Sequence, residues 1–234
     1  MDKPGSSPRM ASAEIHEAAP ALGWYTDQIL FGQNWVDPAL SPRDRSLLTC
    51  STLISRSYFA QLVNHSKRAI ANGMTPAELI ELATHLTFYA GWPCGMSAVA
   101  TLRDVFASQG IAWAEVAEQT VDDLPICFTS GGLVPDLAAQ LAGAETLADY
   151  TGRVILNDLW QRWTLKPRDR SLATIAALVA GGDTGQLPFH VQRGLDNGLT
   201  AAELTAALTH LAFYAGWPKA MAALPVVQAA CAGR

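Results

Sequence analysis

Two nearly identical stretches of the chain combine side chains that can exchange protons, donate hydrogen bonds and line an apolar wall. Segment 85–93 reads HLTFYAGWP and segment 210–218 reads HLAFYAGWP. In each, His, Tyr and Trp are spaced i, i+4 and i+7, so a helix would carry all three rings along one stripe. Such a stripe predicts one wall of a pocket, although rings at helical spacing are also typical of a core. The residues are His85, Tyr89 and Trp92, and His210, Tyr214 and Trp217.

A second pair of segments carries an amide, an imidazole and a guanidinium at the same kind of spacing. An imidazole exchanges protons near neutral pH, and a guanidinium pairs with a carboxylate. The pattern therefore predicts a site for an anionic substrate. The alternative is a solvated arginine beside a hydrogen-bonded core histidine. The residues are Gln61, His65 and Arg68, and Gln186, His190 and Arg193.

Both pairs belong to an internal duplication. A shift of 125 positions aligns residues 40–99 with 165–224 without a gap, and about half of the aligned residues are identical. We expect a disordered tail over 1–20, a first repeat over 21–106, a linker over 107–135 and a second repeat over 136–234. Because so small a unit buries its apolar surface poorly, the two repeats are expected to pack as an internal pseudo-dimer.

The elements that must position these side chains are predicted to be helices. Thr75 and Glu78 form a capping box that opens a helix, and Thr200 and Glu203 repeat it. An Asn-Gly pair before each box supplies the left-handed residue that ends the preceding helix. The helix opened by Thr75 should stop or kink before Pro93. No segment shows strand alternation, so the predicted class is all-α.

Composition limits the classes of function. The formal net charge is −5, and no Lys/Arg cluster is present, which argues against nucleic-acid and anionic-membrane surfaces. No apolar run has the length of a signal peptide core or a membrane span. The four cysteines lie far apart without a CxxC pair, so neither a disulfide framework nor a zinc site is indicated. We expect a cytoplasmic protein whose partner is a small-molecule substrate.

The order of the motifs PRDRSL, QLxxHxxR, NGxTxxE and HLxFYAGWP resembles the carboxymuconolactone decarboxylase family, here in two tandem copies. The resemblance implies an all-helical fold with pockets shared between units, and a homo-oligomer, with a trimer of pseudo-dimers favoured. A related branch reduces peroxides through a CxxC motif before the histidine. Here Tyr58 and Gln61 precede His65, and Asp183 and Gln186 precede His190, so a thiol peroxidase is excluded.

The resemblance further implies a cofactor-free lyase that removes a carboxylate from an unsaturated lactone. Such a reaction needs anchors for anionic oxygens, an apolar wall and an acid that protonates carbon. We assign His190 and His65 as acid/base residues, and His210 and His85 as donors to the developing enolate. Arg193 or Arg68 would anchor a carboxylate, and the Gln, Tyr and Trp residues would complete the pocket. Members of the family often have Glu where Gln61 and Gln186 stand, so a carboxylate base is absent here.

The repeats differ most just before the histidine of the QLxxHxxR motif, where 55–60 reads SRSYFA and 180–185 reads AGGDTG. The second sequence is closer to the family pattern, which favours an active site at His190 if only one is active. Isomerisation, dehydration or lactone opening on the same scaffold remain alternatives, as does a non-catalytic binding or scaffold protein. A metal site is disfavoured because HxxxH spacing and nearby carboxylate ligands are lacking.

Overall fold

The computed structural model describes residues 9–116 and 139–232, and every regular element in them is helical. Of these two ranges, the first contains α1 (Ala13–Ala18), α2 (Pro20–Trp24), the π-helix η1 (Tyr25–Phe31), the 3-10 helix η2 (Asn34–Val36), α3 (Pro42–Ser55), α4 (Phe59–Ala71), α5 (Pro76–Ala90), α6 (Trp92–Ser108) and the 3-10 helix η3 (Trp113–Glu115). The second contains α8 (Glu145–Tyr150), the π-helix η5 (Thr151–Leu159), α9 (Pro167–Gly181), the 3-10 helix η6 (Thr184–Gln186), α10 (Leu187–Asp196), α11 (Ala201–Ala215) and α12 (Trp217–Ala232). The predicted all-α class is confirmed.

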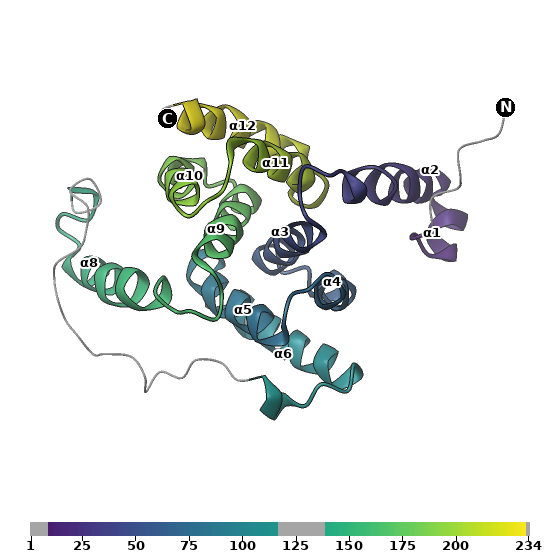
Figure 1. Cartoon of the computed structure of the whole chain (residues 1–234), viewed down its shortest axis with the longest axis horizontal. Coiled ribbons are helices and arrows are strands. Elements are labelled where there is room, and N and C mark those ends of the chain that lie inside the picture. Colours follow the sequence, from purple (N-terminus) through teal and green to yellow (C-terminus); the bar gives the residue numbers. More distant parts are fainter. Residues whose placement is uncertain (1–8, 117–138, 233–234) are drawn as a thin grey trace.

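Two equivalent helices, α3 and α9, lie side by side at the centre of the molecule (Figure 1). Every residue from Asp44 to Ile54 and from Asp169 to Ala180 is buried, as expected for helices enclosed on all sides. Helix α3 also packs on α11 of the second repeat, and α9 packs on α5 of the first. The two repeats therefore share one core, which confirms the predicted pseudo-dimer.

Reciprocal ion pairs join the central helices at their first turns. Arg43 Nη1 lies 2.8 Å from Asp169 Oδ2, and Arg168 Nη1 lies 2.9 Å from Asp44 Oδ1. Each arginine also contacts the capping-box glutamate of its own repeat, Glu78 or Glu203. The PRDRSL motif thus links the starts of α3 and α9 to each other and to the helices that carry the HLxFYAGWP motif.

The predicted helix boundaries are confirmed. Thr75 and Thr200 both make the full capping box, and the glycines that precede them, Gly73 and Gly198, have φ of 96°. Ser41 Oγ accepts from the Asp44 amide, whereas no side chain caps α9. The local sequence therefore specifies where the central and flanking helices begin.

The helix that carries the His and Tyr of the HLxFYAGWP motif ends before the Trp, so a continuous stripe of three rings cannot form. Helix α5 ends at Ala90, Gly91 has φ of 98°, and Trp92 begins α6. Trp92 is 61% exposed and its counterpart Trp217 is 55% exposed. The predicted His-Tyr-Trp stripe is therefore wrong for both tryptophans, because the left-handed glycine turns the chain before the third ring.

Part of the segment predicted to be a disordered tail is helical. The amides of Met10 and Ala11 donate to Asp27 Oδ1 at 2.7 and 2.9 Å, and His16 Nε2 lies 2.9 Å from Asp27 Oδ2. These bonds attach α1 to η1, and that contact was not visible in the local sequence. Residues 1–8 of the tail and 117–135 of the predicted linker lie outside the described residues.

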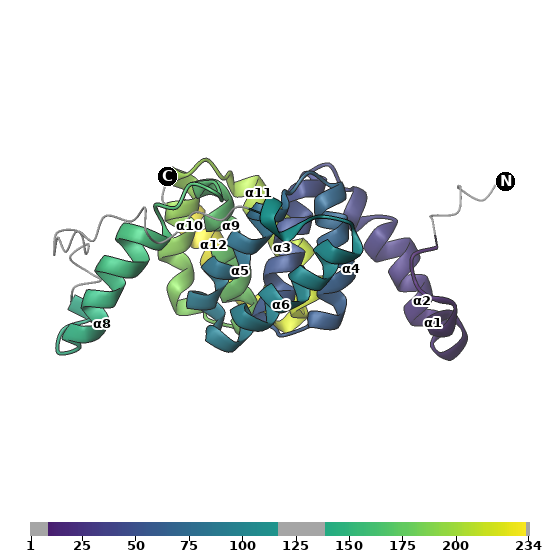
Figure 2. The ribbon, with the colours of Figure 1, turned by 90° about the horizontal axis from the view of Figure 1, so that it is seen from below.

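Two arms project from opposite ends of the helical body (Figure 2). One is formed by α2 and η1 and the other by α8 and η5, and they occupy equivalent places in the two repeats. No helix in the described part of the chain has the length and apolar character needed to cross a membrane.

Candidate functional site

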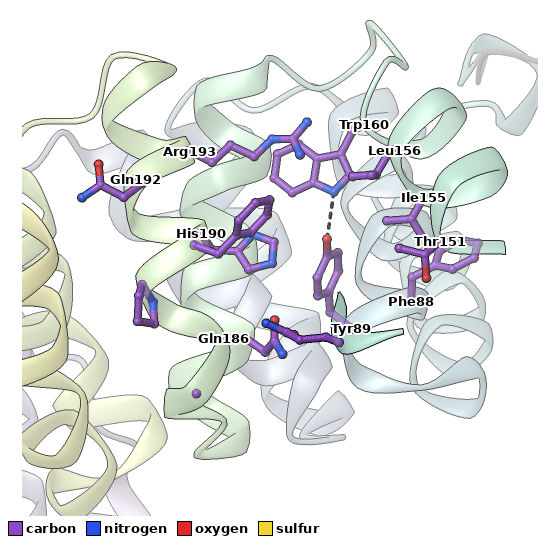
Figure 3. Close-up of a pocket in the computed structure, with 14 residues that line it drawn as sticks. Phe88, Tyr89, Thr151, Ile155, Leu156, Trp160, Gln186, His190, Gln192 and Arg193 are labelled. Atoms are coloured by element: carbon purple, nitrogen blue, oxygen red, sulfur yellow. Dashed lines mark hydrogen bonds between the residues drawn. The ribbon is translucent and has the colours of Figure 1, made fainter. Parts of the chain in front are cut away.

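One candidate site forms where α10 of the second repeat faces α5 of the first. The ring of His190 lies 5.5 Å from that of Tyr89 and 5.8 Å from that of Trp160, which follows η5. Trp160 Nε1 donates to Tyr89 Oη at 2.8 Å, so the two repeats are joined by a hydrogen bond within the site (Figure 3). The site is therefore built from both repeats, with Tyr89 from the first and Trp160 and His190 from the second.

A cavity of about 560 Å³ opens beside this cluster. Its walls come mainly from α5, η5, η6 and α10: His190 and Arg193 lie on α10, and Phe88, Tyr89, Ile155 and Leu156 come from α5 and η5 (Figure 3). That volume suits a small organic molecule. The lining residues are Phe88, Tyr89, Gln140, Thr151, Ile155, Leu156, Trp160, Gly185, Gln186, Pro188, Phe189, His190, Gln192 and Arg193.

His190 is neutral at pH 7 in the unliganded protein. Its side chain is 6% exposed, and Nδ1 has no hydrogen-bond partner. Burial lowers the pKa of His190 to about 4, and the positive charge of Arg193 acts in the same direction. A buried imidazole nitrogen that has no protein partner is available for a ligand.

Arg193 supplies positive charge to the same cavity. Its guanidinium carbon lies 3.7 Å from the centre of the Trp160 ring, a cation–π contact that holds the guanidinium against the ring. Burial lowers the pKa of Arg193, but an arginine remains charged at neutral pH. Within residues 9–116 and 139–232 it has no carboxylate partner, so an anionic substrate would provide one.

His85 is held behind Tyr89 rather than open to the cavity. Thr174 donates its hydroxyl proton to the Arg170 carbonyl at 2.8 Å, so its oxygen accepts from His85 Nε2 at 2.7 Å. Nδ1 faces Arg170 Nη1 at 3.4 Å. His85 has no exposed surface, and burial lowers its pKa well below the usual range. Both ring nitrogens of His85 thus face protein groups, and its predicted role as donor to an enolate stays a prediction.

The pseudo-equivalent cluster joins α4 of the first repeat to α11 of the second. His65 lies 5.4 Å from Tyr214, and Trp35 Nε1 donates to Tyr214 Oη at 2.8 Å. Nδ1 of His65 is buried without a partner, and burial lowers its pKa to about 4. The predicted sharing of each site between the two repeats is thus present twice in the geometry.

His210 is satisfied on both ring nitrogens, like His85, but by different partners. Nδ1 donates to Asn34 Oδ1 at 2.6 Å, and Nε2 lies 2.8 Å from Thr49 Oγ1. The side chain has no exposed surface, and burial lowers its pKa to about 3. Both ring nitrogens of His210 are thus engaged by protein groups, and its predicted contact with a substrate stays a prediction.

The two clusters differ in how their arginines are packed. Arg68 lies over both Phe31 and Trp35, at 4.8 and 5.2 Å from the ring centres. At the position equivalent to Phe31 the second repeat has Leu156, which lines the cavity beside His190. The larger ring in the first repeat covers a face of its arginine that the second repeat leaves to the cavity.

The remaining predicted residues are divided between the cavity and the surface. Gln186, the last residue of η6 and the N-cap of α10, lines the cavity together with His190 and Arg193. Gln61 lies on α4 and is exposed. Trp217 lines a separate cavity of about 270 Å³ between α11 and α12, and neither it nor Trp92 joins a histidine cluster.

Sequence reasoning missed Trp160 and Thr174 and their counterparts, Trp35 and Thr49. The signal was present, since both pairs are retained at the 125-residue shift. However, these tryptophans and threonines lie outside the motifs that contain the histidines, and they complete the clusters only when the two repeats pack together. In the described residues no group of three or more His, Cys, Asp or Glu side chains is placed to hold a metal ion.

The tandem architecture and the paired histidine clusters agree with a comparison against known families. The model of the carboxymuconolactone decarboxylase family matches residues 20–104 and again residues 145–229. The chain belongs to this family. The two matches cover both repeats, including every histidine, arginine and tyrosine of the two clusters.

Two curated relatives of this family member are similar over one repeat-sized stretch. A 4-carboxymuconolactone decarboxylase of Acinetobacter baylyi is 33% identical over 88 residues, which is 38% of this chain and 66% of the relative. Nitrosuccinic acid decarboxylase of Metarhizium robertsii is 35% identical over 69 residues, which is 30% of this chain and 48% of the relative. The chain thus spans about half to two thirds of each relative's length.

Proposed function

We propose that the protein is a cofactor-free decarboxylase that acts in the cavity beside His190 on a small anionic substrate. The observation that carries the proposal is the convergence of three features at one cavity: an unpartnered buried imidazole, an arginine without a carboxylate partner and an apolar wall. The family membership and the names of both relatives support a decarboxylase-like activity.

Arg193 would anchor the substrate through a carboxylate or an enolate oxygen. Its charge is partly desolvated and lies against the ring of Trp160, so a bound anion gains an ion pair in a region of reduced dielectric. Because Trp160 is in turn fixed by Tyr89, the orientation of the guanidinium depends on both repeats. This arrangement selects for an anion.

The apolar wall would favour loss of the carboxylate that leaves. Phe88 and Leu156 line the cavity from α5 and η5, Phe189 lines it beside His190, and none of the three offers a hydrogen bond to a carboxylate. A carboxylate held against such a wall loses hydration that carbon dioxide does not need. The wall therefore disfavours the charged reactant relative to the neutral product.

His190 would deliver the proton that completes the reaction. The bound anion offsets the charge of Arg193 and stabilises the imidazolium, so His190 takes up a proton as the substrate binds. The carbon–carboxylate bond then breaks, carbon dioxide leaves, and the electron pair passes into a conjugated acceptor. The imidazolium protonates the resulting carbanion at carbon and returns to its neutral form.

The printed names of the relatives suggest the class of substrate. Carboxymuconolactone is an unsaturated lactone and nitrosuccinic acid carries a nitro group, and both groups accept the electron pair left by decarboxylation. We infer that the substrate of this chain likewise bears a carboxylate next to an electron-accepting group. Isomerisation, dehydration and lactone opening remain alternative outcomes for such a substrate, and product analysis distinguishes them.

Release of carbon dioxide from 4-carboxymuconolactone and from nitrosuccinate, measured with the purified full chain, tests the proposal. The His190→Gln variant is expected to lower kcat by about 100-fold, because the proton donor is lost. His65→Gln is the matched control in the other repeat and should retain most of the activity.

Full turnover by a folded His190→Gln variant would overturn the assignment of His190. Binding of both compounds with no chemical change in either would instead favour a non-catalytic binding protein. Circular dichroism of each variant establishes that the helical fold is intact.

A further inference from the structure

One buried arginine occurs at the same position of both repeats, as Arg170 and as Arg45, but its partners differ between them. In the second repeat Arg170 has no exposed surface, and its Nη2 donates to Glu81 Oε1 and, at 2.8 Å, to the Arg162 carbonyl. Glu81 is itself fully buried and also accepts from Arg162 Nε and Nη2, both at 2.9 Å. The buried guanidinium is thus compensated by a buried carboxylate from the other repeat.

The equivalent arginine of the first repeat has no such buried carboxylate beside it among the described residues. Arg45, the counterpart of Arg170, is 1% exposed, and its Nε has no partner. Its Nη2 donates to the Asp37 carbonyl, and the nearest carboxylate oxygen, Asp37 Oδ1, lies 3.6 Å away on a side chain that is 55% exposed. The residue equivalent to Glu81 is Ala206. A buried positive charge is therefore compensated only by a solvent-screened aspartate.

A cavity of about 420 Å³ lies between Arg45 and Ala206. Its other lining residues have small or polar side chains, among them Ala39, Ala202, Thr205, Thr209 and Asn34. It shares no lining residue with the cavity beside His190. The space therefore adjoins both the undercompensated guanidinium and the alanine that replaces the glutamate of the other repeat.

We propose that this cavity binds a small monocarboxylate, whose carboxylate group takes the place on Arg45 that the Glu81 side chain takes on Arg170. The internal repeat supplies the precedent, since the equivalent arginine already holds a carboxylate. The small side chains of Ala202, Thr205 and Thr209 suit a short ligand, and Asn34 adds an amide to the lining. Asp37 at the rim repels a second negative charge, which favours a monoanion over a dicarboxylate.

Occupancy of the cavity would be communicated to the His65 cluster. Asn34 lines the cavity and also accepts the hydrogen bond from His210 Nδ1. The His210 ring packs against Trp35 and Tyr214, the two residues that surround His65. An anion that reorients Asn34 therefore reaches the histidine cluster of the first repeat without entering it.

Acetate is the probe that tests this site. Saturation-transfer difference NMR on the acetate methyl group, at constant ionic strength set with chloride, should show binding to the full chain. Ala206→Glu places a carboxylate where acetate would bind and should weaken the signal about tenfold or more. Ala201→Glu adds the same charge to α11 outside the cavity lining and should leave the acetate signal unchanged.

The Arg193→Gln variant separates this site from the cavity of the proposed decarboxylase. The proposal requires that Arg193→Gln retain acetate binding and that Ala206→Glu lose it. The reverse pattern, or an acetate signal equal in wild type and Ala206→Glu, would overturn it, as would no binding to wild type. If Ala206→Glu does not fold, Ala206→Leu, which fills the same space without charge, should show the same loss.

Discussion

Two kinds of histidine occur in each cluster, and they differ in which nitrogen atoms are engaged. His190 and His65 each have a buried Nδ1 with no partner, whereas His85 and His210 have partners on both nitrogens. The sequence predicted all four as site residues but not this difference. It could not, because the partners of His85 are Thr174 and Arg170, more than eighty positions away and in the other repeat.

The hydrogen bond between Trp160 and Tyr89 leads to a prediction at a single atom. Tyr89→Phe removes the acceptor of a buried indole N–H, which costs about 1–3 kcal/mol of stability, and it frees the ring on which Arg193 rests. We expect kcat/KM to fall about tenfold, as a result of poorer orientation of Arg193. Steady-state kinetics and urea unfolding measure the two effects.

Tyr214→Phe makes the same change in the other cluster, where Trp35 loses its acceptor. It should cost a similar amount of stability and leave the activity near that of wild type, because Phe31 covers the equivalent arginine. Equal losses of activity in the two variants would show that both clusters turn over substrate.

The starts and ends of single helices were the best predicted features of the structure. The capping boxes at Thr75 and Thr200, the glycines that end α4 and α10, and the break at Gly91 all depend on neighbouring residues, so the sequence contains them. The attachment of α1 was not predicted, since it depends on Asp27 in another helix. The predicted orientation of Trp92 was wrong, because the turn at Gly91 separates this ring from the helix that carries His85 and Tyr89.

Apolar side chains on the projecting arms are exposed in the described part of the chain. Trp24 and Tyr25 on the first arm are 53% and 59% exposed, and Leu147 and Tyr150 on the second are 57% and 53% exposed. Because η5 also lines the cavity beside His190, a partner on this arm would border the site. We infer that the arms contact further copies of the chain, in keeping with the proposed homo-oligomer.

Light scattering coupled to gel filtration tests this inference. Trp24→Glu combined with Leu147→Glu should lower the measured mass to that of one chain, whereas Val36→Glu, at a similarly exposed residue outside the arms, should leave it unchanged. A wild-type protein that is already monomeric at micromolar concentration would contradict the inference.

The stability of the whole molecule should depend on pH through its buried histidines. In the folded protein the pKa values of His65 and His190 are lowered to about 4 and that of His210 to about 3, mainly by burial, whereas an exposed histidine titrates near 6.5. Between these values the unfolded chain binds more protons, so acidification favours unfolding. Each histidine removes up to about 1.4 kcal/mol per pH unit in this interval.

Urea unfolding at pH 7, 6 and 5 checks this dependence. The free energy of unfolding should be nearly constant above pH 7 as far as these groups are concerned, and should fall as the pH decreases from about 6.5 toward 4. His65→Gln removes one titrating group and should reduce the slope. A slope that is unaffected by His65→Gln would mean that this histidine is protonated in the folded protein.

At the level of the whole chain, the duplication made the pseudo-dimer predictable, because two small similar units bury more surface together than apart. The contacts between the two repeats were not predictable in detail. Which helix of one repeat completes the cluster of the other depends on the packing of α3 against α11 and of α9 against α5. The roles of residues that differ between the repeats, such as Phe31, Leu156 and Ala206, can be inferred only when that packing is known.

The enclosure of α3 also has a consequence for synthesis of the protein. On the ribosome the first repeat emerges well before α9 and α11, the helices that cover α3. Until they appear, α4, α5 and α6 can cover only part of α3, whose residues from Asp44 to Ile54 are all buried in the finished protein. Stable folding of the first half must therefore await the second, and a chaperone that shields apolar segments would find its binding site there in the interval.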